Sequence, residues 1–202
     1  MPVYEPNYKR LDRGPADYDH RNVLTVSYVY KLPKLNGGNA ALRYAVNGWQ
    51  PNGIYSFRSG DPLTITGAGN SGTGLGRERS IWNGKNPYGP TTCTGVTSAC
   101  KPFLKKANFS TKPLYTVNTP PSYGNVVKGS FTGLQYNDWH VSLMRLFPIY
   151  ESTKFEFRAE YFNILNHTNL GDPVQAVTSS SFGRITSAQD PRIGKLGVKL
   201  LF

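Results

Sequence analysis

Three charged side chains alternate along one segment of the sequence and are of the types that do acid–base chemistry. Glu156, Arg158 and Glu160 occupy every second position of the stretch 154–162. Glycoside hydrolysis uses a pair of carboxyl groups, which the two glutamates could supply. A basic residue between the two carboxylates is, however, more typical of a charge-paired polar face on a β-strand. We therefore expect a polar, salt-bridged strand face here and no hydrolase site.

The segment 67–72 matches the glycine pattern G-x-G-x-x-G of dinucleotide-binding proteins. That pattern holds a pyrophosphate only where a helix follows and presents its N-terminus to the phosphates. Here the chain continues as Thr-Gly-Leu-Gly to residue 76, and two glycines in such a short stretch disfavour a helix. We expect a flexible loop and no nucleotide cofactor.

The histidines and cysteines add no metal-binding or catalytic pattern. His20, His140 and His167 are far apart in the sequence, and none has carboxylates at metal-ligand spacing. His140 is expected to be a polar residue on a strand face. Cys93 and Cys100 enclose a short polar segment, and we favour a disulfide over two free thiols. No enzyme activity, cofactor or metal site is expected.

The chain is strongly basic, with 23 Lys and Arg residues against 12 Asp and Glu residues and a net charge of +11. Such a balance is typical of nucleic-acid-binding proteins. Eight of the basic residues and only one acidic residue lie in the segment 67–135, which lacks strand or helix periodicity. A basic loop also suits other anionic surfaces, including lipid phosphates. We expect no nucleic-acid partner, and a nucleic-acid binder stays the weakest alternative, recognisable by steeply salt-dependent affinity.

Alternating apolar and polar residues indicate β-strands in several parts of the chain. No segment shows a helical period with caps, and no run of 18 apolar residues is present, which excludes a membrane-spanning helix but not a membrane barrel. We expect an all-β fold, an antiparallel meander of about five or six strands. The predicted strands are 22–30, 49–58, 136–147, 154–162 and 192–202, with 63–66 as an extension of the second and 182–185 as a short partner of the last.

The last strand is the most informative of these. Leu196, Val198, Leu200 and Phe202 share one parity, while two lysines and a glycine occupy the other. This alternation fits the closing strand of an outer-membrane β-barrel and equally fits the edge of a soluble sheet. Alternation alone leaves both structures open.

Loop lengths favour the barrel. The connection before residue 154 is tight, whereas the segments 67–135 and 163–191 are long. Long loops are unusual in compact soluble domains, but short turns at one end and long loops at the other are typical of outer-membrane barrels. If the C-terminus is periplasmic, the strand directions place segment 67–135 outside the cell. A closed barrel needs at least about eight strands, so we expect this chain to be the C-terminal portion of a larger transmembrane barrel.

A series of motifs supports this interpretation and indicates a family. In order along the chain, they resemble the C-terminal end of Oar-like TonB-dependent outer-membrane receptors, which often begin with a carboxypeptidase-regulatory-like domain. The likeness covers about residues 15–202 apart from 67–135, and its most specific part is 157–167. The motifs are Asp19-His-Arg-Asn22, Gly48-Trp-Gln50, Ser59-Gly-Asp-Pro62, Phe157-Arg-Ala-Glu-Tyr-Phe-Asn-Ile-Leu-Asn-His167 and Phe182-Gly-Arg-Ile-Thr186.

The resemblance implies a plugged barrel of about 22 strands that takes up nutrients with energy from an inner-membrane TonB complex. Residues 1–202 would form a partial barrel domain with the extracellular loop 67–135. The plug, the N-terminal domains and a signal peptide are expected to be absent. Such a fragment would transport nothing by itself and would need the remainder of the barrel and plug. The TonB complex would be a partner only through that missing part.

The same resemblance assigns roles to individual residues. The barrel-assembly machinery would read the C-terminal strand, and a disulfide between Cys93 and Cys100 would pin the outer loop. The protein would lie in the outer membrane of a Gram-negative cell, in contact with its lipid, with long loops outside and a periplasmic C-terminus. The recognised C-terminal residues would be Leu196, Val198, Leu200 and Phe202, and the lumen-facing residues His140, Glu156, Arg158 and Glu160.

The main alternative is a secreted β-sandwich binding module, such as an adhesin or carbohydrate-binding domain. Its aromatic side chains would form a stacking platform or a core, whereas in a barrel they would form a belt at the membrane boundary. A soluble, cooperatively melting monomer that binds glycans would identify this alternative. The aromatic residues concerned are Tyr28, Tyr30, Trp49, Trp139 and Tyr161.

Overall fold

The computed structural model describes residues 8–67, 78–90, 102–111 and 124–202. The chain divides into two compact units, and each is described by itself. One, the sheet unit, comprises Asn22–Arg58, Tyr136–Asn169 and Gln189–Phe202. The other, the insert unit, comprises Met1–Arg21, Ser59–Gln135 and Leu170–Ala188.

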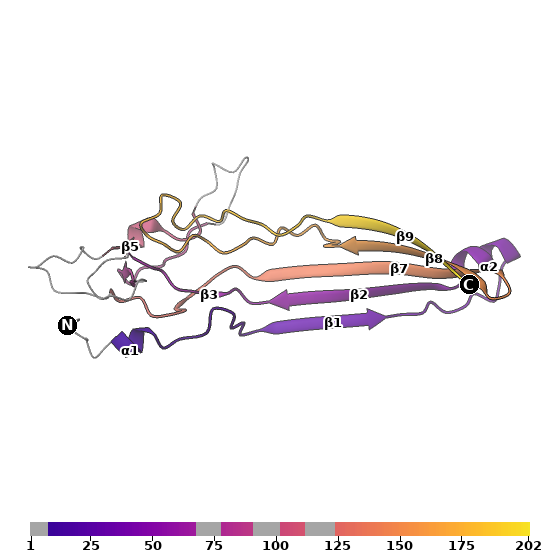
Figure 1. Ribbon diagram of the computed structural model, residues 1–202, viewed down its shortest axis with the longest axis horizontal. Helices are drawn as coiled ribbons and strands as arrows, with labels where there is room; N and C mark the ends of the chain where they lie inside the picture. Colours follow the sequence, from indigo (N-terminus) through magenta and orange to yellow (C-terminus); the bar gives the residue numbers. More distant parts are fainter. Residues whose placement is uncertain (1–7, 68–77, 91–101, 112–123) are drawn as a thin grey trace, which may run out of the picture. The chain divides into compact units, whose positions relative to one another are not determined.

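The sheet unit is a single antiparallel sheet of five strands that pair in the order in which they occur along the chain (Figure 1). The prediction of an all-β antiparallel meander is therefore confirmed. The strands are β1 (Val23–Val29), β2 (Trp49–Arg58), β7 (Tyr136–Tyr150), β8 (Thr153–Phe162) and β9 (Ile193–Leu201).

Cross-strand register sorts the side chains of the sheet into an apolar face and a polar face. Because side chains alternate along a strand, paired residues lie on the same face. Two sets of cross-strand partners illustrate the apolar face: Tyr55 with Trp139, and Pro51 with Leu143, Ala159 and Leu196. The apolar face also contains Leu24, Val26, Tyr28, Trp49, Phe57, Val141, Phe147, Phe155, Phe157, Tyr161, Val198 and Leu200.

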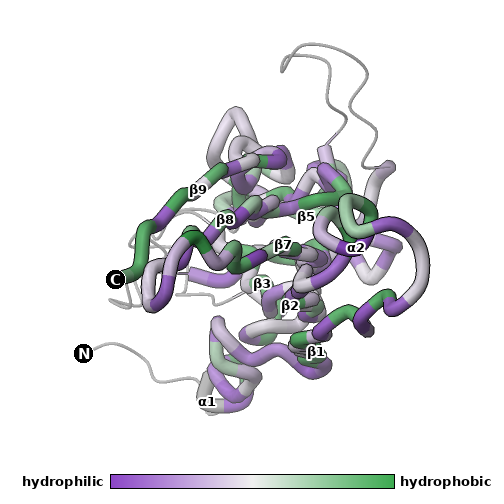
Figure 2. The backbone as a smooth tube through the Cα atoms, turned by 90° about the vertical axis from the view of Figure 1, so that its right-hand side faces the viewer, coloured by the Kyte–Doolittle hydropathy of each residue, from purple (hydrophilic) through white to green (hydrophobic). Residues whose placement is uncertain are grey.

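Much of the apolar face is exposed, above all on β9. Leu196 is 75% exposed and Val198 is 65% exposed, and both belong to β9. Figure 2 shows the green and purple residues that alternate along β9. A sheet in water buries its apolar face against another element, so this surface is suited to an apolar environment.

One end of the sheet carries a two-residue turn and a longer connection that contains a short helix. Glu151 and Ser152 join β7 to β8 as a two-residue turn, and Glu151 has a φ of 40°. β1 and β2 are joined by residues 30–48, which contain α2 (Ala40–Val46). Figure 1 shows α2, the β7–β8 turn and the C-terminus at the same end of the sheet.

The expectation that no helix would form is wrong at α2. The side chain of Asn39 caps it by accepting a hydrogen bond from the Leu42 N–H at 2.7 Å. Seven residues make fewer than two full turns and are too short for a helical period to stand out. A four-residue helix, α1 (Tyr8–Leu11), lies in the insert unit. Among the described residues, no helix is long and apolar enough to cross a membrane.

The insert unit has a small hydrophobic core of its own. The secondary structure of its described residues comprises α1, β3 (Pro62–Leu63), β4 (Ile81–Trp82), η1 (Lys106–Asn108), β5 (Phe109–Ser110) and β6 (Phe131–Thr132). β3 pairs with β6 and β4 pairs with β5, so residues 63–66 do not extend β2 as predicted. The buried core residues are Leu63, Ile65, Phe103, Leu104, Phe109, Val126, Phe131, Val177 and Phe182.

Phe109 is the centre of the aromatic packing in this core. Its ring centroid lies 5.4 Å from that of Phe131 and 5.5 Å from that of Phe182, both in edge-to-face geometry. The described parts of segment 67–135 therefore contribute to a packed core although they show no strand periodicity, because their strands are only two residues long.

Truncation of Phe109 tests whether the insert unit is a cooperative core. Phe109→Ala should remove about 3–5 kcal/mol from the local stability of this unit, because the cavity loses both transfer free energy and ring contacts. Hydrogen exchange of insert-unit peptides measures the change. Tyr18→Ala, at a side chain that is 83% exposed, should change protection by less than about 0.5 kcal/mol. Equal losses in the two variants would contradict the core.

Candidate functional site

The predicted polar residues of β8 form a charge-paired row on the polar face. The Arg158 guanidinium lies 2.9 Å from a Glu156 carboxylate oxygen and 3.5 Å from one of Glu160. Lys199 and Lys195 of β9 lie opposite the two glutamates. Because the Arg158 side chain is 46% exposed, each pair contributes about 0–1 kcal/mol. The row therefore sets the polarity of the face more than the stability of the fold.

The other residues that the sequence predicted to have a role lie on one of the two faces of the sheet, after its last strand, or outside the described part of the chain. His140 shares the polar face with the β8 row, because Ser142, two residues further along β7, pairs with Glu160. Leu196, Val198 and Leu200 lie on the apolar face of β9. Phe202 follows that strand and is 90% exposed. Cys93 and Cys100 lie outside the described residues, so their disulfide stays a prediction.

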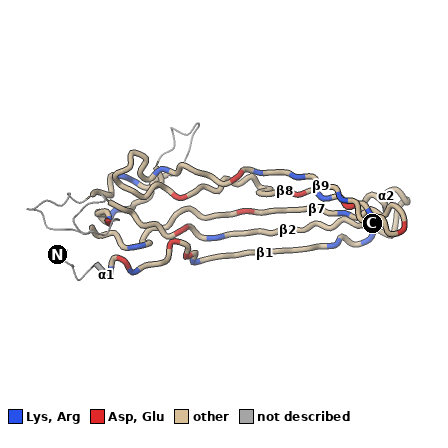
Figure 3. Tube along the Cα trace, in the orientation of Figure 1, with Lys and Arg blue, Asp and Glu red and all other residues tan. Residues whose placement is uncertain are grey.

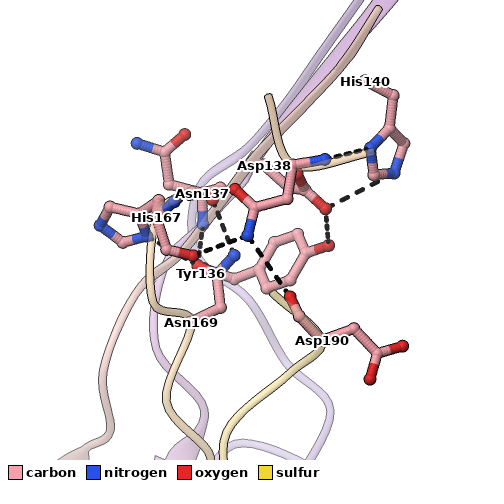
Figure 4. A network of polar contacts seen from close by, with 8 residues as sticks. Tyr136, Asn137, Asp138, His140, His167, Asn169 and Asp190 are labelled. Carbon is pink, nitrogen blue, oxygen red and sulfur yellow. Dashed lines mark hydrogen bonds and ion pairs between the residues drawn. The ribbon is translucent and has the colours of Figure 1, made fainter. Parts of the chain in front are cut away.

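A network of polar contacts, which we call the rim network, lies where β7 begins and β8 ends (Figure 4). The Tyr136 hydroxyl donates to Asp138 Oδ2 at 2.9 Å, and His140 Nε2 lies 3.5 Å from the same oxygen. His140 Nδ1 accepts a hydrogen bond from the Asn163 backbone N–H at 3.2 Å. In the neutral imidazole this leaves the proton on Nε2, which points toward the carboxylate.

Asparagine side chains hold the rim network together. Asn169 Oδ1 accepts from the Asn137 N–H at 2.9 Å, and its Nδ2 donates to the Asn137 carbonyl at 2.8 Å. This amide therefore pairs with β7 as the backbone of a neighbouring strand would. Asn163 binds both backbone groups of His167, at 2.8 and 2.9 Å. Asn166 Oδ1 accepts from the Arg192 N–H at 3.1 Å, at the approach to β9.

We call Asn163, Asn166 and Asn169 the asparagine clasp, and the first two lie in segment 157–167, the most specific part of the family resemblance. Asn163 and Asn166 adopt φ values of 50° and 51°, a left-handed conformation that asparagine tolerates better than most residues. Asn163 is 4% exposed and Asn169 is 3% exposed. Residues 157–167 therefore combine a strand with the turn that ties its end to β7 and β9.

A cavity of about 330 Å³ lies beside the rim network. Its lining combines carboxylate, imidazole, amide and ammonium groups, so it can hold a polar solute by hydrogen bonds. Asp138 Oδ1 is buried without a hydrogen-bond partner. No cluster of three or more potential metal-ligating residues occurs in the described part of the chain. The main polar lining residues are Tyr136, Asp138, His140, Asn169, Asp190 and Lys195.

Sequence reasoning missed Asp138 and Tyr136 as partners of His140. The available signal was their spacing, since all three have the same parity in β7 and so share a face. The hydrogen bonds between asparagine side chains and distant backbone groups correspond to no pattern in the sequence. Asn169 and Asn137 are 32 residues apart, and nothing local predicts that they meet.

Sequence reasoning also missed a buried arginine on the apolar face. The Arg145 guanidinium lies 4.2 Å from the Phe147 ring centroid, 5.2 Å from that of Tyr44 and 5.4 Å from that of Trp49. Its NH groups donate to the carbonyl of Tyr44 and, at 2.6 Å, to that of Ala45. We call Arg145 and these three rings the arginine–aromatic cluster. It holds the last carbonyls of α2 against the apolar face.

Replacement of Asn169 tests the asparagine clasp. Asn169→Ala should destabilise the sheet unit by about 1–3 kcal/mol, because it removes both hydrogen bonds to the Asn137 backbone and the contact of Oδ1 with His167 Nδ1 at 3.1 Å. Asn169→Asp keeps the acceptor but turns a buried carboxylate oxygen toward the Asn137 carbonyl in place of the donor, so its loss of stability should be at least as large. Urea titration and exchange of the Asn137 amide measure both variants. Wild-type protection of that amide in Asn169→Ala would contradict the clasp.

Comparison with known proteins agrees with this geometry. The family model described as an outer membrane beta barrel domain matches residues 1–195. No match was found among curated proteins or among solved structures. The family match covers most of the chain, and an antiparallel sheet with one apolar and one polar face is consistent with part of a barrel wall. The chain therefore belongs to the outer membrane beta barrel domain family and is an outer-membrane protein.

Proposed function

We propose that this chain is the C-terminal wall segment of an outer-membrane TonB-dependent receptor of the Oar-like kind, which serves nutrient uptake. One observation carries the proposal: a single sheet has an exposed apolar face and, on its other side, a row of paired charges. In a barrel wall the apolar face contacts lipid and the polar face lines the water-filled lumen. His140, Glu156, Arg158 and Glu160 would then face the lumen.

The energetics of the two faces favour this orientation over its reverse. A lysine or arginine on the lipid face of a barrel strand costs about 2–4 kcal/mol at the bilayer midplane. The reversed wall would place Arg158, Lys195 and Lys199 in that position. It would also expose the apolar side chains of five strands to water, at about 25 cal/mol per Å² of apolar surface.

Closure of a barrel would supply pairing partners for the two edge strands of the sheet, β1 and β9. No other described strand pairs with the outer edges of β1 and β9, and hydrocarbon tolerates no open sheet edge. Membrane barrels contain at least about eight strands, and plugged transporters about 22. Both edges must therefore pair with further strands of the same barrel. Energy coupling to the TonB complex would act through the plug and not through these strands.

The direction of the strands gives the orientation in the membrane. We place the end that carries α2, the β7–β8 turn and the C-terminus in the periplasm, because the β7–β8 turn has only two residues and barrel turns are short on that side. The insert-unit segments are joined to the opposite ends of β2, β7, β8 and β9, so they belong outside the cell. Barrel-assembly machinery would recognise Leu196, Val198, Leu200 and Phe202. Within this proposal the rim network contacts passing solutes and does no catalysis.

Lysines placed on adjacent residues of β7 test which face meets lipid. Leu143→Lys should destabilise the membrane-folded chain by about 2–4 kcal/mol, since the ammonium would enter hydrocarbon. Ser142→Lys adds the same charge on the polar face opposite Glu160, so its effect should be below about 1 kcal/mol. Urea titration of the chain refolded in lipid vesicles measures both.

Equal effects of the two lysines would contradict a lipid-facing apolar surface. A chain that leaves the vesicles and melts cooperatively as a soluble, glycan-binding monomer would instead support the secreted β-sandwich alternative.

A further inference from the structure

We propose that the β1–β2 connection, residues 30–48, is a phospholipid-binding element that lies in the headgroup layer of the membrane at the end of the sheet carrying the C-terminus. This inference rests on the proposed function, because it takes the apolar face of the sheet as the lipid side of a barrel wall. We call residues 30–48 the α2 connection. Its occupant would be an anionic phospholipid, bound through the phosphate and the upper acyl chain.

The α2 connection is fixed on the apolar side of the sheet. Arg145 and Trp49 both lie on that face and are paired across β7 and β2. The Trp49 indole N–H donates to the Ala45 carbonyl at 2.9 Å, and the Arg145 guanidinium donates to the same carbonyl. The Tyr44 ring lies 6.2 Å from that of Phe147. The connection therefore leaves the wall toward lipid and not toward the lumen.

Burial of the Arg145 charge has a structural consequence. Arg145 is 5% exposed and two of its guanidinium nitrogens donate to carbonyls of α2, so it is too buried to reach a lipid phosphate itself. Its role is to position the α2 connection, as an internal tether. The cations that contact phosphate must therefore come from the connection itself.

Apolar side chains project from the α2 connection into the surroundings. α2 buries none of its residues, although Leu42 and Val46 are large and apolar. An exposed group of this kind marks an interaction surface. Tyrosines are favoured at the boundary between headgroups and acyl chains, where one end of the ring is apolar and the other wet. The exposed residues are Tyr30, Leu32, Leu35, Leu42, Tyr44 and Val46.

The charges of the α2 connection complement a phosphate layer. Lys31, Lys34 and Arg43 are its only charged residues, and no Asp or Glu occurs between 30 and 48. Figure 3 shows lysine and arginine positions at the end of the sheet near α2. The β7–β8 turn at the same end of the sheet contributes one acidic residue, Glu151. Basic residues beside an apolar helix face are typical of segments that lie on an anionic bilayer surface.

The α2 connection is also ordered in advance. Asn47 pairs with the Leu35 backbone through both amide atoms, at 2.7 and 3.1 Å, and Asn39 caps α2. Gly48 has a φ of 86° and turns the chain from α2 into β2. A surface held in its binding conformation loses less entropy when a ligand orders it. The α2 connection is therefore held in one conformation by its own hydrogen bonds.

Vesicle flotation of the full chain tests the proposal. Wild-type protein is refolded with vesicles of phosphatidylcholine alone and with vesicles that also contain phosphatidylglycerol. The combined variant Lys31→Gln, Lys34→Gln and Arg43→Gln is compared with a control that removes the same number of cations from the insert unit, Lys85→Gln, Lys105→Gln and Lys106→Gln. Near-ultraviolet circular dichroism checks that each variant folds as the wild type does.

The wild type and the control should bind the phosphatidylglycerol vesicles more tightly than phosphatidylcholine vesicles, by on the order of ten- to a hundredfold, and salt should reduce the gain. The α2-connection variant should lose most of that preference while still binding phosphatidylcholine. Retention of the full preference by that variant would overturn the inference and leave the barrel wall intact. Failure of every protein to bind either vesicle would overturn the proposed function itself.

Discussion

A shift of β7 by one residue against β2 or β8 would move every side chain of that strand to the wrong face. The period of two in a β-strand makes register an all-or-none property. Strand β7 is the longest of the sheet and lies between β2 and β8, so its register governs both halves. The opposed faces, the paired charges of β8 and the lipid-facing residues of β9 all depend on this single alignment.

Asparagine amides secure that alignment where regular pairing stops. The β7–β8 ladder begins at Val141, and Asn169 pairs with β7 just beyond it, at Asn137. The same pairing, in which both amide atoms bond one residue's backbone, occurs three more times among the described residues: Asn163 on His167, Asn47 on Leu35 and Asn125 on Trp82. Each amide supplies the donor and acceptor of a missing strand, so the chain can end a strand without leaving backbone groups unpaired. This explains why asparagine recurs in the loops next to the sheet.

The fold could be predicted from sequence where the information is local. Alternation predicted β2 with its observed bounds and β8 to within one residue. A strand with one apolar and one polar face requires apolar and polar residues at alternate positions, and this pattern can be seen in the sequence. The same alternation separated Glu156 and Arg158 from Leu196 and Val198. Contacts between distant segments left no such pattern. Arg145 meets Tyr44 across 101 residues, and the insert core assembles around two-residue strands.

Site-directed spin labels placed one at a time along residues 194–201 of the vesicle-inserted chain test the central assignment of faces most directly. Power saturation compares accessibility to oxygen, which concentrates in the bilayer, with accessibility to a water-soluble nickel complex. Oxygen accessibility should peak at Leu196, Val198 and Leu200, and nickel accessibility at Lys195, Gly197 and Lys199. Profiles without this alternation, or with the two reagents peaking at the same residues, would contradict a wall whose apolar face meets lipid.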